Sequence, residues 1–207
     1  MILGSIYVTA GAIIIGVPIG IFMAVFMARF CPGSLYKIVY GFFGMEVLVP
    51  LLRNTFAVFN CKGNSMLAAS ILLGIMILPT IIGVSESAIR AVPNSYYEGS
   101  LALGADHERS VFFAVLPAAK SGILAGVVLG IGRAIGETMA VIMVAGNQPA
   151  MAHSIFKGVR TMTANVVIEM GYATGIHREA LIATGVVLFV FILLINLLFS
   201  VIKRREK

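Results

Sequence analysis

The stretch 94-NSYYEGSLALGADHERSVFFAVLPAAKSGILAGVVLGIGRAIGETMAVIMVAGN-147 decides how this chain folds. Its first part is polar, whereas residues 123–143 are apolar or small except for Arg133, Glu137 and Thr138. An apolar run of about twenty residues is long enough to cross the roughly 30 Å hydrocarbon core of a bilayer. The stretch therefore predicts a polar loop that leads into a membrane-spanning helix.

Two short helices joined by a glycine are predicted for the polar loop, residues 94–117. Ser95 and Glu98 have the spacing of a capping box, in which the two side chains satisfy free backbone amides at the helix start. Gly104 is expected to end this helix, because glycine most readily takes the left-handed conformation that follows a last turn.

Asp106 is in position to cap the second helix, and Leu116-Pro117 is expected to stop it, because proline lacks the amide that a helix interior needs. A simple connecting loop would not need these signals for helix starts and ends. We therefore expect residues 94–117, here called the knob, to dock against a partner. The alternative is that the knob packs inside its own chain. The apolar residues of the docking face are Tyr97, Leu101, Val111, Phe112 and Val115.

Composition places the chain in a membrane. Of its 207 residues, 59% are hydrophobic and 12% are charged, whereas soluble domains average about 25% charged residues. The length allows a single transmembrane domain, residues 1–207, of about five helices. The net charge of +6 does not indicate a nucleic-acid partner, because most basic residues lie in short loops beside apolar runs, as in membrane proteins.

An all-α, polytopic transmembrane bundle follows from the apolar runs. The first run is too long for a cleavable signal peptide and lacks a basic start. The second apolar run, residues 38–52, is short for a membrane-spanning helix and contains Glu46. A long polar loop, residues 148–179, carries a half-buried helix near residues 164–170. The expected spans are residues 6–28 with a kink at Pro18, 38–52, 66–82 with a break at Pro79, 123–143 and 180–202.

Positive charge sets the expected orientation. With the loop at residues 94–117 in the cytoplasm, nine of the 15 Lys and Arg residues lie inside, five lie outside, and Arg133 lies within the membrane. Since cytoplasmic loops carry the excess of Lys and Arg, we expect the C-terminus in the cytoplasm and the N-terminus outside the plasma membrane.

Catalytic, nucleotide and metal patterns are missing from the sequence. It contains no G-x-x-x-x-G-K-[ST], no nucleophile elbow and no HExxH, so we expect no enzyme, cofactor or metal site, and ATP must be handled by another chain. Cys31 and Cys61 fall at opposite ends of the first two spans, on different sides of the membrane, so no disulfide is expected. The histidines lie scattered in polar loops and are interpreted as solvated: His107, His153 and His177.

Glu86 and Arg90 lie four residues apart after the third apolar run. Glu followed by a basic residue at this spacing favours an ion pair on one helix face. We interpret the two residues as a surface pair at the end of a helix.

Arg133 is the notable charge of the fourth span. Ten residues into a span that starts at residue 123, it lies about 15 Å deep, at the midplane. A charge there costs about 3 kcal/mol on insertion scales and must be paired or wetted. Glu137, one turn later, can form a structural bridge. Alternatively the pair lines a polar cavity, because Gly122, Gly126 and Gly130 share its side of the helix and small-residue faces meet protein rather than lipid.

The knob resembles the signature loop of ABC importer permeases, which reads Glu-Ala-Ala, three residues, Gly, nine residues, Ile, one residue, Leu-Pro. Glu98, Gly104 and Leu116-Pro117 match this pattern in register. The departures from it are Gly99 and Ser100 in place of the two alanines and Ala114 in place of the Ile.

Other segments are similar to the phosphate-specific members of that family, and the chain resembles their C-type membrane subunit over nearly its whole length. These relatives carry extra residues between Lys37 and Val39 and one further helix before the position of Met1. The similar segments are 40-YGFFG-44, 74-GIMILPT-80, 132-GRAIGETMA-140 and 144-VAGN-147.

The resemblance implies the type I ABC importer permease fold and several partner chains. ATP-binding subunits would hold the knob and hydrolyse ATP, and a second homologous permease subunit would share a phosphate pathway that includes Arg133 and Glu137. The resemblance also implies an extracytoplasmic phosphate-binding protein. The long polar loop at residues 148–179 has room to receive it, and the alternative is that this loop is a simple lid over the bundle. The alternatives are an importer of another oxyanion, such as molybdate or sulfate, and an ATP-independent channel or carrier.

Overall fold

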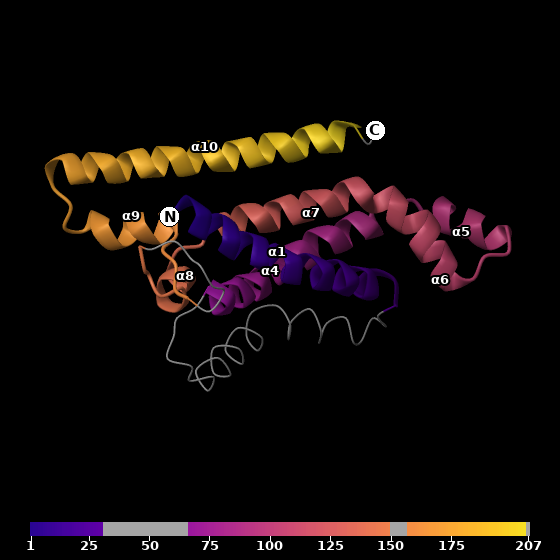
Figure 1. Cartoon of the computed structure of the whole chain (residues 1–207). Coiled ribbons are helices and arrows are strands. Elements are labelled where there is room, and N and C mark those ends of the chain that lie inside the picture. Colours follow the sequence, from indigo (N-terminus) through magenta and orange to yellow (C-terminus); the bar gives the residue numbers. More distant parts are fainter. Residues whose placement is uncertain (31–65, 150–156, 206–207) are drawn as a thin grey trace.

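The computed structural model describes residues 1–30, 66–149 and 157–205. The second expected span, both cysteines, Glu46 and His153 lie outside the described residues. Figure 1 shows long helices lying side by side, with α5 and α6 at one end of the bundle and α8 and α9 at the other. We call these the α5–α6 end and the α8–α9 end.

Helices account for nearly all of the described chain, as predicted. Those long and apolar enough to cross a membrane within the described ranges are Ile2–Phe30, Met66–Arg90, His107–Gly136 and Gly175–Leu198. In chain order the elements are α1 (Ile2–Val25), a π-helical turn (Phe26–Phe30), α4 (Met66–Arg90), α5 (Asn94–Ala102), α6 (His107–Ser110), a second π-helical turn (Val111–Val115), α7 (Leu116–Gly136), α8 (Met139–Val144), α9 (Met162–Met170) and α10 (Gly175–Arg205).

Prolines interrupt these helices less than their sequence context predicts. Pro79 lies inside α4, which continues without a break to Arg90, so the expected break is wrong. The stop expected at Pro117 is also wrong, because the chain stays helical from His107 to Gly136. The π-helical turn directly before Pro117 is wider than an α-helical turn and leaves room for the proline ring beside the preceding carbonyl groups.

Helix α4 lies between α1 and α7 and contacts both. Small residues allow this close approach. A Cβ atom on Gly130 would lie 2.8 Å from Ile81 Cγ1, one on Gly126 would lie 3.0 Å from Ser85 Oγ, and one on Gly122 would overlap Ala88. The glycine stripe of α7 therefore faces another helix of the same chain, so of the two surroundings expected for it, protein or a cavity, it meets protein.

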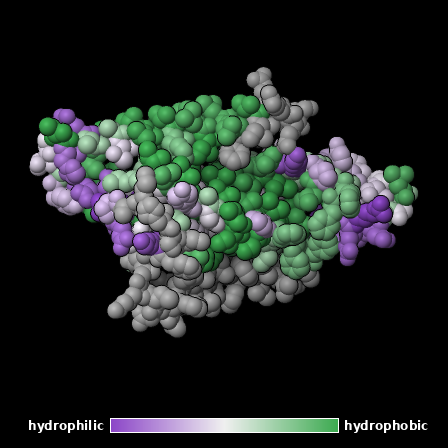
Figure 2. Space-filling view, in the orientation of Figure 1, coloured by the Kyte–Doolittle hydropathy of each residue, from purple (hydrophilic) through white to green (hydrophobic). Residues whose placement is uncertain are grey.

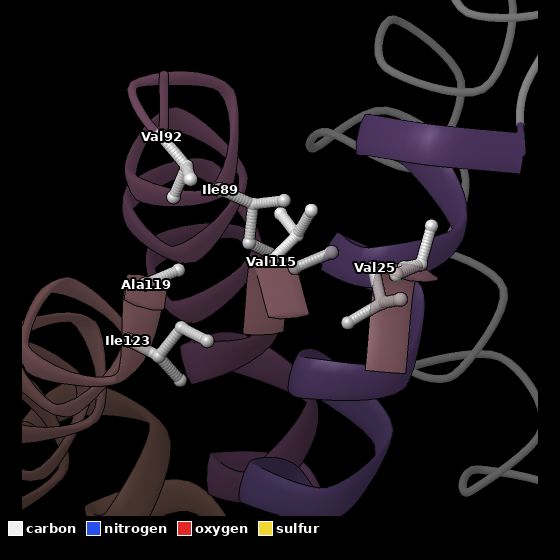
Figure 3. Packing of buried hydrophobic residues seen from close by; sticks show 8 residues of the cluster. Val25, Ile89, Val92, Val115, Ala119 and Ile123 are labelled. Carbon is white, nitrogen blue, oxygen red and sulfur yellow. The ribbon is translucent and has the colours of Figure 1, made fainter. Parts of the chain in front are cut away.

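A cluster of buried apolar side chains joins α1, α4 and α7 at the α5–α6 end (Figure 3). Val111 and Val115 from the π-helical turn belong to it and are 1% and 0% exposed. They were expected on the docking face of the knob, and that expectation is wrong, because they pack inside the chain. The cluster comprises Ala24, Val25, Ile89, Val92, Val111, Val115, Ala119 and Ile123.

Helix α10 runs along the outside of the bundle and contacts α7 and α9 (Figure 1). Only 6% of its apolar span is buried. Figure 2 shows a broad apolar band over the middle of the molecule and hydrophilic residues gathered at both ends. A helix that is apolar on all sides needs a hydrocarbon environment or another apolar protein surface around it.

Candidate transport site and its attachments

The helix that carries Arg133 ends sooner than the sequence predicts. Helix α7 stops at Gly136, Glu137 adopts an extended conformation (φ −69°, ψ 128°), and α8 begins at Met139. The expected continuous span over residues 123–143 is therefore wrong. Hydrogen bonds satisfy the backbone at this break, since Thr138 Oγ1 donates to Gly136 O at 3.2 Å and Thr163 Oγ1 donates to Glu137 O at 3.2 Å.

Arg133 lies in the last turn of α7, not at the middle of a helix, and its side chain is exposed. The structure describes both Arg133 and Glu137, and no ion pair joins them. The half-buried Glu137 side chain instead accepts a hydrogen bond from Ala140 N at 3.4 Å, at the start of α8. The structural bridge between Arg133 and Glu137 is therefore not formed.

An exposed face of α7 carries Arg133. Within the described part of the chain, nothing lies within 4 Å of a Cβ atom built on Gly132 or Gly136. Leu129 is 55% exposed and Met139 is 68% exposed. Among the described residues, none forms a hydrogen bond or an ion pair with Arg133. On this face the Arg133 cation, which has no partner among the described residues, lies on the same helix as two glycines with open space beside them in the described part of the chain.

Buried hydroxyl groups hold α9 against this break. Thr161 Oγ1 accepts a hydrogen bond from Ala164 N at 3.3 Å and caps α9, the short helix that the sequence predicts. Thr161 Oγ1 also lies 3.1 Å from Thr163 Oγ1. Ser5 Oγ of α1 accepts a hydrogen bond from Met162 N at 3.0 Å. The first turn of α9 is thereby tied to α1 and to Glu137.

Arg160 anchors the same loop. Its Nε donates to Asn147 O at 3.1 Å, and its Nη1 donates to Asn165 Oδ1 at 3.2 Å and to Glu169 Oε1 at 2.8 Å. His177 Nε2 of α10 lies 3.3 Å from Glu169 Oε2. His177 is exposed, as the sequence predicts, and it also contacts the Glu169 carboxylate.

Hydrogen bonds from Tyr172, Arg160 and His177 stabilise the Glu169 carboxylate and lower its pKa below the usual value of 4.5. The same carboxylate raises the pKa of Tyr172 above its usual value of 10.0. Glu169 thus links the loop to the first turn of α10.

The knob at the α5–α6 end keeps its predicted hinge but not its predicted caps. Gly104 has φ +86°, in the left-handed region that favours glycine, and it separates α5 from α6 as expected. Pro93 is the N-cap residue of α5, and no side-chain bond caps that helix, so the Ser95–Glu98 capping box is wrong. Asp106 occupies the predicted N-cap position of α6, but its side chain forms no capping bond.

Exposed apolar side chains lie at the tip and side of the knob. Leu103, next to Gly104, is 91% exposed, and Phe113 is 78% exposed. Leu101 and Phe112, both expected on a docking face, are also exposed, and so is Glu98. The exposed apolar surface of the knob therefore includes Leu101, Leu103, Phe112 and Phe113, but not Val111 and Val115.

Aromatic and cationic contacts fasten the knob to the rest of the chain. Tyr97 Oη lies 2.7 Å from His107 Nδ1, and the rings of Phe30 and His107 lie 5.1 Å apart. The Arg29 guanidinium lies 5.9 Å from the centre of the Tyr97 ring, and its Nη2 donates to Ile89 O at 3.4 Å. His107 is exposed, yet these contacts make it part of the attachment and not a merely solvated residue.

The Glu86–Arg90 ion pair is confirmed at 2.7 Å, but the expected surface location is wrong for Glu86, which is 3% exposed. Arg90 Nη2 also donates to Met27 O at 3.3 Å, which ties the end of α4 to the end of the first span.

The model of the family described as binding-protein-dependent transport system inner membrane component matches residues 16–207. The chain belongs to this family. The permease is 37% identical to the probable ABC transporter permease protein YqgH of Bacillus subtilis over 219 residues, which cover 96% of the permease and 70% of YqgH. It is 32% identical to the phosphate transport system permease protein PstC of Mesorhizobium japonicum, over 94% of the permease and 69% of PstC.

Solved structures agree on the fold. A chain of the MetNI methionine ABC transporter superposes on the permease with a TM-score of 0.78, at 18% sequence identity, over 99% of the permease and 94% of that chain. The expected fold class, an all-α permease of the type I ABC importer kind, is confirmed. The permease is a multi-pass protein of the inner membrane and a transport subunit by family.

Proposed function

We propose that the permease is a membrane subunit of an ATP-driven phosphate importer and forms the translocation pathway with a second homologous permease subunit. The observation that carries this proposal is Arg133, an exposed cation of α7 beside Gly132 and Gly136 that pairs with none of the described residues. A cation of a membrane protein that has no described partner needs either water or an anion next to it. The phosphate transport named for the PstC relatives supports phosphate as that anion.

The chemistry of Arg133 suits a tetrahedral oxyanion. A planar guanidinium presents several N–H donors, which can bind two oxygens of one phosphate at once. Glu137 lies four residues later, and its negative charge weakens the hold on the anion. Transport needs such a balance, because a site that binds too tightly does not release.

The knob would connect the permease to ATP-binding subunits in the cytoplasm. Its exposed Leu103 and Phe113 offer apolar area to a groove on the partner, and Glu98, Gly104, Leu116 and Pro117 match the signature loop of the family. ATP hydrolysis then takes place on the partner, and the permease itself needs no cofactor. The C-terminus lies in the cytoplasm with the knob, at the face of a bacterial plasma membrane.

An extracytoplasmic phosphate-binding protein would deliver the anion at the opposite, α8–α9 end. The described part of the loop there, residues 157–174, is held by the hydrogen bond from Arg160 Nη1 to Glu169 Oε1 at 2.8 Å. A surface held by such bonds suits docking, because less conformational entropy is lost when a partner binds.

Reconstitution tests the proposal. The permease, a second permease subunit, ATP-binding subunits and a binding protein are placed in liposomes, and uptake of phosphate, sulfate and molybdate is compared. We expect ATP-dependent phosphate uptake that requires the binding protein. Preferred uptake of sulfate or molybdate would identify another oxyanion importer, and uptake without ATP would identify a channel or carrier.

A further inference from the structure

Thr163 lies 26 residues after Glu137 in sequence, yet its hydroxyl donates a hydrogen bond to the Glu137 carbonyl oxygen at 3.2 Å. We infer that Thr163 is a positioning residue for transport, which holds the break between α7 and α8 and links α9 to the turn that carries Arg133. This inference rests on the proposed function, because it assigns Arg133 to the anion pathway.

The carbonyl group of Glu137 needs a partner. At the end of a helix the last carbonyl groups have no donor within the helix. Glu137 is held at two points, since its carbonyl accepts from Thr163 and its carboxylate accepts from Ala140 N at 3.4 Å. The geometry of Glu137 sets the direction in which α7 ends, and Arg133 is one turn earlier on the same helix.

Thr163 itself is firmly placed. It is 7% exposed, and its neighbour Thr161 is 4% exposed. A hydroxyl carries a single hydrogen, and that of Thr163 goes to Glu137 O, so Thr161 donates to Thr163 Oγ1 across their 3.1 Å contact. The resulting chain of hydrogen bonds runs from the cap of α9 to the end of α7.

This arrangement transmits displacement. The first turn of α9 is bonded to α1 through Ser5 and, through Thr163, to Glu137 directly after α7, so a shift of this turn either moves Glu137 or breaks the Thr163 hydrogen bond. A partner that docks on the α8–α9 end and moves α9 therefore reorients the turn that carries Arg133. Thr163 belongs to α9, and its hydroxyl contacts Glu137, the residue directly after α7.

The test uses the complete transporter in liposomes, with uptake normalised to assembled complex. Thr163→Val removes the hydroxyl at nearly constant volume, and Thr163→Ser keeps it. Thr184→Val is the matched control, because Thr184 is half-buried and its hydroxyl donates to Ala180 O within its own helix, α10, at 2.9 Å. We expect Thr163→Val to lower the maximal rate of phosphate uptake about three- to tenfold, the scale of one lost hydrogen bond.

The apparent KM for phosphate-loaded binding protein should stay near the wild-type value, and the melting temperature of the complex should fall by no more than about 2–4 °C, because the Glu137 carbonyl loses its donor. Thr163→Ser should recover most of the rate, and Thr184→Val should not change it. A wild-type rate in Thr163→Val would overturn the inference. So would a loss explained wholly by less assembled complex, or a Thr163→Val chain that fails to assemble, because the hydroxyl would then serve folding alone.

Arg133→Gln is measured in parallel to separate this inference from the proposed function. Normal phosphate uptake by Arg133→Gln contradicts the pathway assignment, and the role of Thr163 fails with it. If Arg133→Gln loses uptake while Thr163→Val transports at the wild-type rate, only the role of Thr163 is wrong.

Discussion

Arg90 Nε donates a hydrogen bond to Glu86 Oε1 at 2.7 Å, although Glu86 is only 3% exposed. The carboxylate lies inside the packed end of α4, whereas half of the Arg90 side chain reaches the surface. Removing one partner of such a pair leaves an uncompensated charge, which is worse than having no charged group at all.

We therefore expect Arg90→Met to destabilise the permease by about 1–3 kcal/mol. The value lies below the roughly 3–5 kcal/mol of a fully buried pair because Arg90 is half-exposed. The double variant Arg90→Met with Glu86→Gln should regain part of the loss, since a neutral amide needs no counter-charge. Thermal unfolding in detergent measures both, with Arg109→Met at an exposed position as the control. If the single and the double variant are equally stable, the loss does not come from an unpaired Glu86 carboxylate.

At the break after α7, Arg133→Gln should assemble at normal levels and transport little phosphate, because an amide lacks the charge that offsets dehydration of the anion. Arg133→Lys should recover only part of the phosphate uptake, since an ammonium group cannot bind two oxygens in a plane. Uptake in liposomes and the amount of purified complex are the measurements.

The Glu137→Gln variant should still assemble, because an amide oxygen can accept the bond from Ala140 N. If Arg133→Gln fails to assemble and the double variant with Glu137→Gln assembles and transports, the two residues have a structural role only.

Leu103→Ser on the knob should reduce co-purification of the ATP-binding subunits at least several-fold without changing the stability of the isolated permease. Leu103 is 91% exposed, so its side chain supports no internal packing. Ile176→Ser is the matched control, as Ile176 is 85% exposed at the start of α10. Glu98→Lys should also weaken co-purification. Unchanged capture of the ATP-binding subunits by Leu103→Ser would exclude this tip from the interface.

The contacts that Glu169 makes with Arg160, Tyr172 and His177 should weaken at acidic pH. The pKa of Glu169 is lowered in the folded chain, chiefly by its hydrogen bonds with Tyr172 and Arg160, so its contribution to stability is present above 4.5 and is lost as the pH falls through the lowered value. Hydrogen exchange in α9 and the first turn of α10 should rise in that acidic range. Glu169→Gln should exchange faster at neutral pH and show a weaker acid response; an identical response in both proteins would refute the assignment.

The sequence by itself determined the membrane class, the helical fold and the family. An apolar run must satisfy all its backbone hydrogen bonds within lipid, so length and composition suffice to predict a spanning helix. The left-handed turn at Gly104 and the pair of Glu86 with Arg90 were also predictable, because both depend on residues a few positions apart.

Tertiary structure alone decided where α7 ends, which way Val111 and Val115 point, and how deeply Glu86 is buried. At the break, the Glu137 carbonyl accepts a hydrogen bond from the hydroxyl of Thr163, which is remote in the sequence. Val111 and Val115 meet α1 and α4, and Gly122, Gly126 and Gly130 meet α4, at contacts that no local pattern specifies. A helical stripe indicates that a face is buried, but the neighbour that buries it is chosen only when distant helices pack together.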